Sequence, residues 1–418
     1  MIIGNGSPDQ ILNENQIYNI CEEGFKELKL NNKRFLFIIP DLTRTAPIDI
    51  MFRVVYKLLA DKVELLDFII ALGTHPALTQ DAIYQRVGIT KDEHRTIYSK
   101  ARFFNHQWKT PGQLKHIGTI TEKEVADISG DLMQEKVDIT INKMVFDYDQ
   151  LIIIGPTFPH EVVGFSGGNK YLFPGISGEE IINMFHWLGA LITNPMIIGT
   201  KYTPVRKVID RAAAFLPIKR ICMSLVVKGQ DLAGLYIGTP EEAWEAAADL
   251  SDQIHIVYKE KPYHTVLSRA PEMYEDLWTG GKCMYKLEPV VADGGKLIIY
   301  APHITEVSVS HGDIIEKIGY HVRDYFTKQA KRFRDIPGGV MAHSTHVRGI
   351  GTFENGVEKA RIDVILATGI SRETCHRINL GYQDSANIKI EDYMNRENEG
   401  ILYVPKAGEM LYRLRKKD

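Results

Sequence analysis

The sequence predicts an α/β fold with two domains, each built on a largely parallel sheet flanked by helices. Apolar runs of strand length alternate with segments of helical spacing, and a polar loop containing glycine or proline follows most of these runs. The chain has 418 residues, which is enough for two domains that each bury a core.

The pattern begins near the N-terminus. Residues 8–33 carry helical spacing, and Arg34–Pro40 is an apolar run followed by the polar loop 41–47. We expect a helix over Ile48–Leu59 and a second strand over 63–72, which closes on Gly73. Strand, loop, helix and strand in this order predict a parallel βαβ unit.

Further elements extend the pattern. We expect a helix near 81–86, a short segment that ends at 105–108, strands at 118–120, 137–141 and 151–154, helices at 178–190 and 204–215, a strand at 220–227 and a helix at 240–248. Ligands of open α/β sheets bind outside the carboxyl ends of the strands. The loops carrying Asp41, His75, His106 and His160 all follow such runs, so we expect them at one edge.

Charge and proline interrupt the pattern at 259–262, where we expect a second domain to begin. Buried-strand candidates follow at 265–268, 295–301 and Asp363–Thr368. The predicted domains are therefore 1–262 and 263–418, with a final segment that could pack back on the first domain.

Composition argues against several classes of function. The formal net charge is −3 and 25% of the residues are charged, which gives no signal for nucleic-acid binding. No apolar run reaches membrane-span length and no signal peptide is evident, so we expect a cytoplasmic protein without membrane contact. The four cysteines are scattered, which argues against a disulfide framework or a cysteine zinc site.

The loop after the first strand offers a carboxylate, a hydroxyl and a guanidinium in Asp41, Thr43 and Arg44. Together they could hold an anion near a helix N-terminus. An N-cap with a surface ion pair has the same composition, so the loop alone leaves both interpretations open. His75, next to Gly73 and Pro76, is likewise either a directed imidazole or a structural turn residue.

The most informative stretch is 159–175, which follows a buried-strand pattern and contains His160 and Lys170, ten residues apart. It resembles a phosphate loop, but Tyr171 stands where that motif needs serine or threonine. Glycines allow the backbone to approach a ligand closely. A partly desolvated Lys170 would be a nucleophile, and a solvated loop lysine is the alternative.

Other candidates are weaker alone. His186 lies in an otherwise apolar helical segment and is compatible with a core histidine. Lys282 stands behind Gly280 and Gly281, which is also how a helix C-cap can look. His343 and His346 have the spacing of a metal pair without a third ligand.

Taken together, these residues resemble the nickel-dependent lactate racemase family. The resemblance covers most of the chain. Asp41-Leu42-Thr43-Arg44 is similar to its DxTR loop and Gly73-Thr74-His75 to its GTH turn. His160, then Gly164-Phe165-Ser166-Gly167-Gly168-Asn169-Lys170, Pro174-Gly175-Ile176 and His186 are similar to its H…G[FY]SGG[RN]K…PGI…H pattern, in the same register.

The resemblance implies a two-domain racemase or epimerase of 2-hydroxy acids, with the active site in the interdomain cleft. Its cofactor would be a nickel-pincer nucleotide (nickel pyridinium bisthiocarboxylic acid mononucleotide) made by cofactor-biosynthesis proteins. It implies that Lys170 carries the cofactor through a thioamide and that His186 completes the nickel coordination. The first domain would then bind the cofactor and the second contact substrate.

The resemblance also assigns the remaining site residues. His75 and His160 match the family's acid/base pair, which exchanges the hydroxyl proton while hydride leaves and returns at C2. We assign Asp41, Thr43, Ser166, Gly167 and Gly168 to cofactor binding. Arg44, Trp278, Thr279 and Lys282 are assigned to substrate binding.

One departure affects the substrate. The lactate enzymes have Tyr-Gln where this chain has Trp278-Thr279, and two glycines precede Lys282. The smaller side chains and a threonine hydroxyl favour a longer hydroxylated acid, such as a sugar acid epimerised at C2.

Two other functions remain as alternatives. One is a zinc-dependent hydrolase that uses His75, His106 and His160, although no HExxH motif supports it. The other is a non-catalytic protein that binds a nucleotide or sugar acid. The oligomeric state is not predicted.

Overall fold

The chain divides into two compact units in the computed structural model, which describes residues 2–26, 28, 30–73 and 75–415. The first unit comprises 1–158, 165–182 and 201–254, and the second comprises 159–164, 183–200 and 255–418. The second unit thus takes in two segments that lie within the first 262 residues of the chain. Each unit is described by itself.

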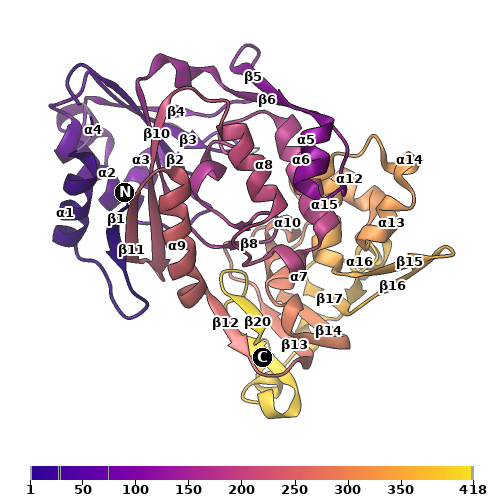
Figure 1. Ribbon diagram of the computed structural model, residues 1–418. Coiled ribbons are helices and arrows are strands. Elements are labelled where there is room, and N and C mark those ends of the chain that lie inside the picture. The colour runs from indigo at the N-terminus through magenta and orange to yellow at the C-terminus, as the bar shows by residue number, and fades with distance from the viewer. Residues whose placement is uncertain (1, 27, 29, 74, 416–418) are drawn as a thin grey trace. The chain divides into compact units, whose positions relative to one another are not determined.

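The first unit is built on a seven-stranded sheet in the order β1-β11-β10-β7-β2-β3-β4 (Figure 1). Its strands are β1 (Ile3–Gly6), β2 (Arg34–Pro40), β3 (Leu65–Ala71), β4 (Ala101–Asn105), β7 (Gln150–Pro156), β10 (Lys219–Lys228) and β11 (Asp231–Gly238). The pairs from β10 to β4 are parallel, whereas β11 is antiparallel to β10 and to β1. The prediction of a largely parallel α/β sheet is confirmed.

Helices cover both faces of this sheet. They are α1 (Glu14–Phe25), α2 (Ile48–Leu59), α3 (Gln80–Val87), α4 (Lys91–Thr96), α5 (Glu122–Ser129), α8 (Pro204–Ala213) and α9 (Pro240–His255). The main core packs α1, α2 and α3 against the sheet, and α9 packs Ala247 and Leu250 against Val226 of β10. Burial on both faces explains why the central strands consist almost entirely of apolar residues.

The predicted strands near 118 and 137 lie outside the main sheet. They form a separate antiparallel pair, β5 (Leu114–Ile120) and β6 (Val137–Asn142). Their alternating burial is typical of a two-stranded sheet with one exposed face, and this explains why they lack the continuous apolar run of β2 or β7.

The strand order places three loops that carry predicted site residues together. The chain runs from β2 outward to β3 and β4, and β7 returns on the other side of β2. Parallel strands end at the same edge, so the loops that follow β2, β3 and β7 emerge beside one another at the switch point of the sheet.

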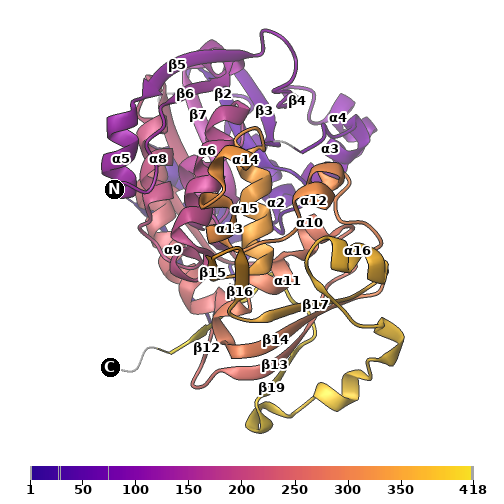
Figure 2. The same cartoon turned by 90° about the vertical axis from the view of Figure 1, so that its right-hand side faces the viewer.

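The second unit contains a five-stranded parallel sheet in the order β18-β17-β14-β13-β19 (Figure 2). These strands are β13 (Tyr263–Arg269), β14 (Val291–Ala301), β17 (Asp363–Thr368), β18 (Gly381–Tyr382) and β19 (Ile401–Val404). Smaller sheets pair β12 (Ile256–Lys259) with β20 (Leu411–Leu414), and β15 (Gly351–Glu354) with β16 (Val357–Ala360).

Short helices surround this sheet. They are α7 (Asn194–Ile197), α10 (Leu277–Gly280), α11 (Lys282–Tyr285), α12 (Gly312–Ile318), α13 (Arg323–Thr327), α14 (Ala330–Phe333), α15 (Gly338–Arg348) and α16 (Arg372–Arg377). The division between the units falls inside α6 (Glu179–Ile192), whose residues from Asn183 onward belong to the second unit. Among the described helices, none combines the length and the apolar character that crossing a membrane requires.

Candidate functional site

The loop after β2 and the turn after β3 meet through Asp41 and His75. Asp41 Oδ2 lies 2.5 Å from His75 Nδ1, while Asp41 Oδ1 accepts hydrogen bonds from the Thr43 backbone N–H at 3.1 Å and from its hydroxyl at 2.7 Å. Asp41 is buried, whereas the His75 side chain is 47% exposed. The turn therefore holds an accessible imidazole against a buried carboxylate.

The charge state of Asp41 follows from these contacts. Burial raises the pKa of its carboxyl, but the hydrogen bonds from His75 and Thr43 and the nearby charge of Arg44 outweigh it and lower the pKa to about 2. Asp41 is ionised at neutral pH and can only accept hydrogen bonds. His75 Nδ1 must therefore carry the proton, which leaves the lone pair of the neutral ring on Nε2.

Sequence reasoning missed Arg86, which fixes the Asp41 loop. Arg86 donates from Nε to the carbonyl of Pro40 at 3.1 Å and from a terminal nitrogen to the carbonyl of Arg44, also at 3.1 Å. Burial lowers the pKa of Arg86, and the charge of Asp41 opposes that shift. Its position at the end of a predicted helix gave no signal of this role, because the loop carbonyls it binds are 40 or more residues earlier.

The glycine loop folds as a short turn, η2 (Gly168–Tyr171), that contains Lys170. Lys170 is half-buried. The Gly73 N–H donates to the Gly175 carbonyl at 2.9 Å, which ties this loop to the turn that carries His75. The predicted residues Asp41, Thr43, Arg44, His75 and Lys170 all belong to loops at the carboxyl edge of the first sheet.

Ser166, Gly167 and Gly168 serve the packing of this loop. The Ser166 hydroxyl accepts from the Phe158 N–H at 2.9 Å and donates to the Pro156 carbonyl at 3.2 Å. Gly167 and Gly168 have φ of 90° and 59°, and a Cβ would lie 2.5 Å from Thr157 Oγ1 at the former and 2.9 Å from Trp244 at the latter. The space beside these glycines is thus already filled by protein atoms.

Arg206 is a second residue that the sequence did not reveal. It donates to the carbonyls of Gly167 at 3.1 Å and Phe165 at 2.5 Å, and its guanidinium lies 4.1 Å from the centre of the Trp244 ring. Burial lowers its pKa to about 10, so it stays charged at neutral pH. The buried, charged Arg206 side chain therefore fixes the glycine loop through the carbonyls of two of its residues.

His106 is a structural residue. It is 1% exposed, its Nε2 lies 3.0 Å from the Ser177 carbonyl, and its Nδ1 accepts from the Asn142 amide at 3.2 Å. Burial lowers its pKa to about 4. Both ring nitrogens are engaged, so the interpretation of His106 as a zinc ligand is wrong. Across the described residues, no group of three or more histidine, cysteine, aspartate or glutamate side chains could hold a metal ion.

His160 belongs to the second unit, at the end of β8 (Pro159–His160). Its Nδ1 accepts from the Val162 backbone N–H at 3.1 Å, so the proton of the neutral ring lies on Nε2. The Glu161 carboxylate lies 3.4 Å from the same Nδ1. The sequence places Glu161 directly after His160, but it showed no sign that the two side chains interact.

Glu161 is ionised and lies near the ammonium groups of Lys286 and Lys282. Burial raises the pKa of its carboxyl, but His346, its own backbone N–H, and the ammonium groups of Lys286 and Lys282 produce a net lowering. A carboxylate that close to His160 favours the protonated imidazolium. The Glu161 carboxylate thus interacts with two predicted site residues: it lies close to the His160 ring, and the charge of Lys282 lowers its pKa.

His186, Trp278 and His343 form another group in the second unit. The Trp278 ring lies 4.2 Å from that of His343 and 4.6 Å from that of His311, centre to centre. Burial is the main cause that lowers the pKa of His343 to about 3, with smaller contributions from neighbouring histidines that include His186. His343 Nε2 also lies 3.3 Å from the Tyr320 hydroxyl, so the histidine pair on α15 is part of a packed aromatic cluster.

Asp276 caps the short helix α10 and holds Thr279, which lies in its first turn. The Thr279 hydroxyl lies 2.9 Å from Asp276 Oδ1 and 3.1 Å from the Asp276 carbonyl, and its N–H donates to Asp276 Oδ1 at 3.0 Å. The hydroxyl proton is therefore directed to Asp276, and only the oxygen lone pairs are left to accept from a ligand. Lys282 lies 5.0 Å from the Tyr274 ring centre, at the start of α11.

Comparisons with known proteins identify several that are similar to this chain. Residues 9–196 match the family model of the lactate racemase N-terminal domain. A lactate racemase from Thermoanaerobacterium thermosaccharolyticum is 24% identical over 297 residues, which are 69% of this chain and 63% of that enzyme. The match therefore spans less than two thirds of that relative's length.

Two solved structures are similar to the chain. A crystal structure of a protein from Thermotoga maritima, a structural genomics target, has a TM-score of 0.87 at 33% identity, covering 97% of this chain and 99% of that chain. The structure of the lactate racemase apoprotein from T. thermosaccharolyticum has a TM-score of 0.72 at 20% identity, covering 99% of this chain and 94% of that chain. This second likeness is one of fold.

Proposed function

Because the chain belongs to the lactate racemase family, we propose that it inverts the configuration at C2 of a 2-hydroxy acid. The single observation that carries this proposal is the hydrogen bond between Asp41 and His75, in the DxTR and GTH motifs at the switch point of the first sheet. It provides a histidine with a defined tautomer at an edge where α/β proteins bind ligands.

His75 acts as the base toward the substrate hydroxyl. The Asp41 carboxylate accepts a hydrogen bond from the protonated Nδ1, so Nε2 has a lone pair that can accept the hydroxyl proton. The same carboxylate stabilises the imidazolium that forms. Thr43 keeps Asp41 in place through its N–H and hydroxyl.

His160 has the complementary tautomer. In the neutral ring its Nδ1 accepts from the Val162 N–H, and the proton lies on Nε2. As the imidazolium, which the Glu161 carboxylate 3.4 Å from Nδ1 favours, the ring has a second proton that it can donate. Inversion at C2 needs one group that takes the hydroxyl proton and a second that returns a proton when hydride comes back to the other face. We propose that neutral His75 and protonated His160 take these opposite roles, and that each takes the other's role in the reverse direction.

We also propose that Lys170 and His186 hold a nickel-pincer nucleotide, through a thioamide and an imidazole–nickel bond. When bound, this group supplies the acceptor and donor of hydride. Two observations fit such a group: the buried atoms Asn169 Oδ1 and Thr157 Oγ1, beside the loop of Lys170, have no hydrogen-bond partner among the described residues, and imidazole is a suitable ligand for nickel. Cofactor-biosynthesis proteins would be its maturation partners.

Arg44 and Lys282 supply positive charge for the substrate carboxylate. Thr279, which is smaller than the glutamine of the lactate enzymes and follows Trp278, favours a hydroxylated acid such as an aldonate. Thr279 would contribute only as an acceptor, because its own proton is directed to Asp276.

Intact-mass and metal analysis test the cofactor part. We expect protein co-expressed with the cofactor-making proteins to carry a nickel-containing adduct, absent from Lys170→Ala and from the charge-matched Lys170→Arg. Stoichiometric zinc without the adduct would instead support a hydrolase. An adduct-free, metal-free protein that still binds hydroxy acids would support a binding protein.

A further inference from the structure

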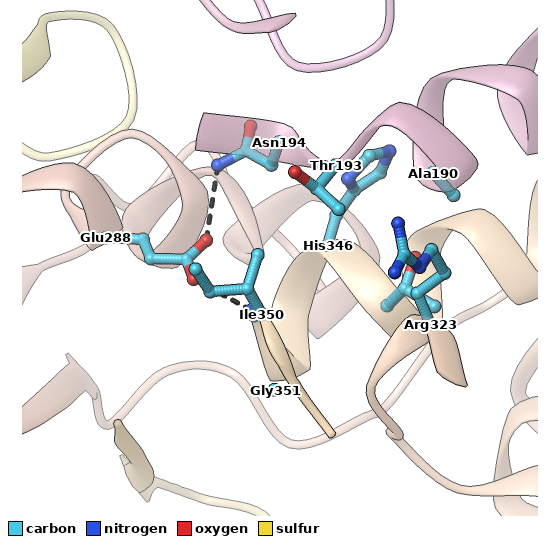
Figure 3. Close-up of a pocket in the computed structure, with 10 residues that line it drawn as sticks. Ala190, Thr193, Asn194, Glu288, Arg323, His346, Ile350 and Gly351 are labelled. Atoms are coloured by element: carbon cyan, nitrogen blue, oxygen red, sulfur yellow. Dashed lines mark hydrogen bonds between the residues drawn. The ribbon is translucent and has the colours of Figure 1, made fainter. Parts of the chain in front are cut away.

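A cavity of about 180 Å³ lies inside the second unit, between the end of α6, the start of α7 and the end of α15 (Figure 3). The argument uses the lining residues Thr193, Asn194, Glu288, Arg323 and His346, all of which belong to that unit. None of them has a role in the catalytic steps proposed above.

Two buried polar atoms in this wall lack partners. Asn194 Oδ1 and His346 Nε2 make no hydrogen bond to any described residue, although their residues are only 3% and 4% exposed. The Asn194 amide nitrogen donates to the Tyr285 carbonyl at 2.8 Å and lies 3.4 Å from Glu288 Oε2, so the amide oxygen turns away from Glu288 (Figure 3). An unpaired buried polar group is destabilising, and a ligand that forms a hydrogen bond with it would remove that cost.

The backbone is strained at the same wall. Thr193 has φ of 86° and ψ of 144°, a conformation that β-branched residues rarely adopt. Such strain is destabilising and concentrates at binding sites. Thr193 and His346 both line the cavity (Figure 3).

The charged side chains that line the cavity already have hydrogen-bond or ion-pair partners within the protein. The Arg323 guanidinium donates to Asp324 Oδ1 at 3.0 and 3.1 Å and to the Leu191 carbonyl at 2.9 Å. Glu288 Oε1 accepts from the Ile350 N–H at 2.9 Å, and burial raises the pKa of this carboxyl. His346 is neutral at neutral pH, because burial lowers its pKa to about 4. A neutral ligand therefore suits the cavity better than an ion.

We propose that this cavity binds a neutral, hydroxyl-bearing group of about six non-hydrogen atoms, since a cavity of roughly 150 Å³ holds benzene. A hydroxyl can donate to Asn194 Oδ1, and a second can pair with His346 Nε2 in either tautomer. The group is either a free polyol or the hydroxylated chain of the hydroxy acid, and the second source rests on the proposed function.

Contacts within the second unit connect the cavity to the segment that carries His160. His346 contributes to the lowered pKa of Glu161, and a Cβ added at Gly189, next to the lining residue Ala190, would lie 3.0 Å from the Val162 carbonyl. Residues that line or adjoin the cavity thus also lie close to the segment that carries His160.

The test is a titration of the full-length protein, followed by NMR of the histidine ring nitrogens and asparagine side-chain amides. Glycerol is expected to shift the His346 and Asn194 signals saturably. Ala190→Leu, which fills the cavity, should abolish these shifts, whereas Met196→Leu, at a residue that is 68% exposed, should retain them.

The arms with gluconate and lactate separate the two sources. If gluconate shifts the His346 and Asn194 signals at a lower concentration than glycerol does, and lactate does not shift them, the ligand is the substrate chain. If glycerol alone shifts these signals, the ligand is a free polyol. The proposal is overturned if none of the three compounds shifts these signals, or if Ala190→Leu leaves the shifts unchanged. These outcomes do not depend on racemase activity, which is assayed separately with lactate.

Discussion

Asp41 Oδ2 and His75 Nδ1 lie 2.5 Å apart, across two loops that follow the neighbouring parallel strands β2 and β3. This contact sets the tautomer of an exposed histidine by means of a buried, ionised carboxylate. It allows the role of His75 to be tested without disturbing the ring itself.

The Asp41→Asn variant should lose most of the activity. An asparagine amide can donate to Nδ1 and so favours the tautomer with the proton on Nε2, which cannot act as the base. We expect kcat to fall by about 10²- to 10⁴-fold with a small change in KM. Thr43→Val, which removes one hydrogen bond to Asp41 but keeps the contact with His75, is the control and should lose far less. Equal losses in both variants would contradict the tautomer argument.

Arg86→Lys tests the support of the same loop. Lysine keeps the charge but cannot reproduce the fork that reaches the carbonyls of Pro40 and Arg44. We expect a loss of about 1–3 kcal/mol in the free energy of unfolding, measured by urea denaturation, because buried carbonyls lose their donors. Arg95→Lys, at an exposed residue of α4, serves as the matched control and should be nearly neutral.

Glu161→Gln tests the protonation of His160. The carboxylate 3.4 Å from Nδ1 favours the imidazolium, so its loss should lower the pKa of His160 by about one unit. NMR titration of the His160 ring in the protein without cofactor measures this shift, and the alkaline limb of the kcat/KM profile, which reports the group that must be protonated, should move in the same direction. Glu180→Gln, an exposed position on α6, should leave both unchanged. An unshifted His160 titration would show that Glu161 has no such role.

His106 should contribute to acid unfolding. Its pKa is lowered to about 4 in the folded protein, so the unfolded state binds the proton first, and stability is lost as the pH falls from about 6.5 to 4. His106→Phe should destabilise the protein at pH 7, because Asn142 and Ser177 lose their partner, but reduce the pH slope by up to about 1.4 kcal/mol per unit. His116→Asn, at an exposed histidine, is the control. A slope that His106→Phe leaves unchanged would contradict the assignment.

Continuous apolar runs made much of the fold predictable. The predicted bounds of the strand at 34–40, the helix at 48–59 and the strand at 363–368 are those of β2, α2 and β17. These elements are buried or amphipathic, so their periodicity is clear. The antiparallel strand β11 was missed, since Ala233 and Gly234 interrupt its pattern and one of its two partners, β1, lies near the N-terminus.

The candidate site was predictable only in its chemistry-bearing residues. Motif spacing led to the prediction of Asp41, His75 and Lys170 as site residues, because they lie in loops that follow apolar strands. Arg86, Arg206 and Glu161 were not identified, since their roles depend on contacts with backbone carbonyls or a neighbouring ring that only the folded chain defines. Local spacing also could not distinguish the buried His106 from the exposed His75.

The most direct test of the proposed function is whether the protein inverts C2. Protein co-expressed with the cofactor-making proteins, and carrying the nickel adduct, is incubated with single enantiomers or C2 epimers of lactate and aldonates, and the products are resolved by chiral chromatography. We predict that the wild type converts at least one such acid to a mixture of both configurations at C2, that Lys170→Ala does not, and that aldonates are preferred to lactate. Nickel-loaded protein that leaves every tested hydroxy acid unchanged would contradict the assignment as a racemase or epimerase.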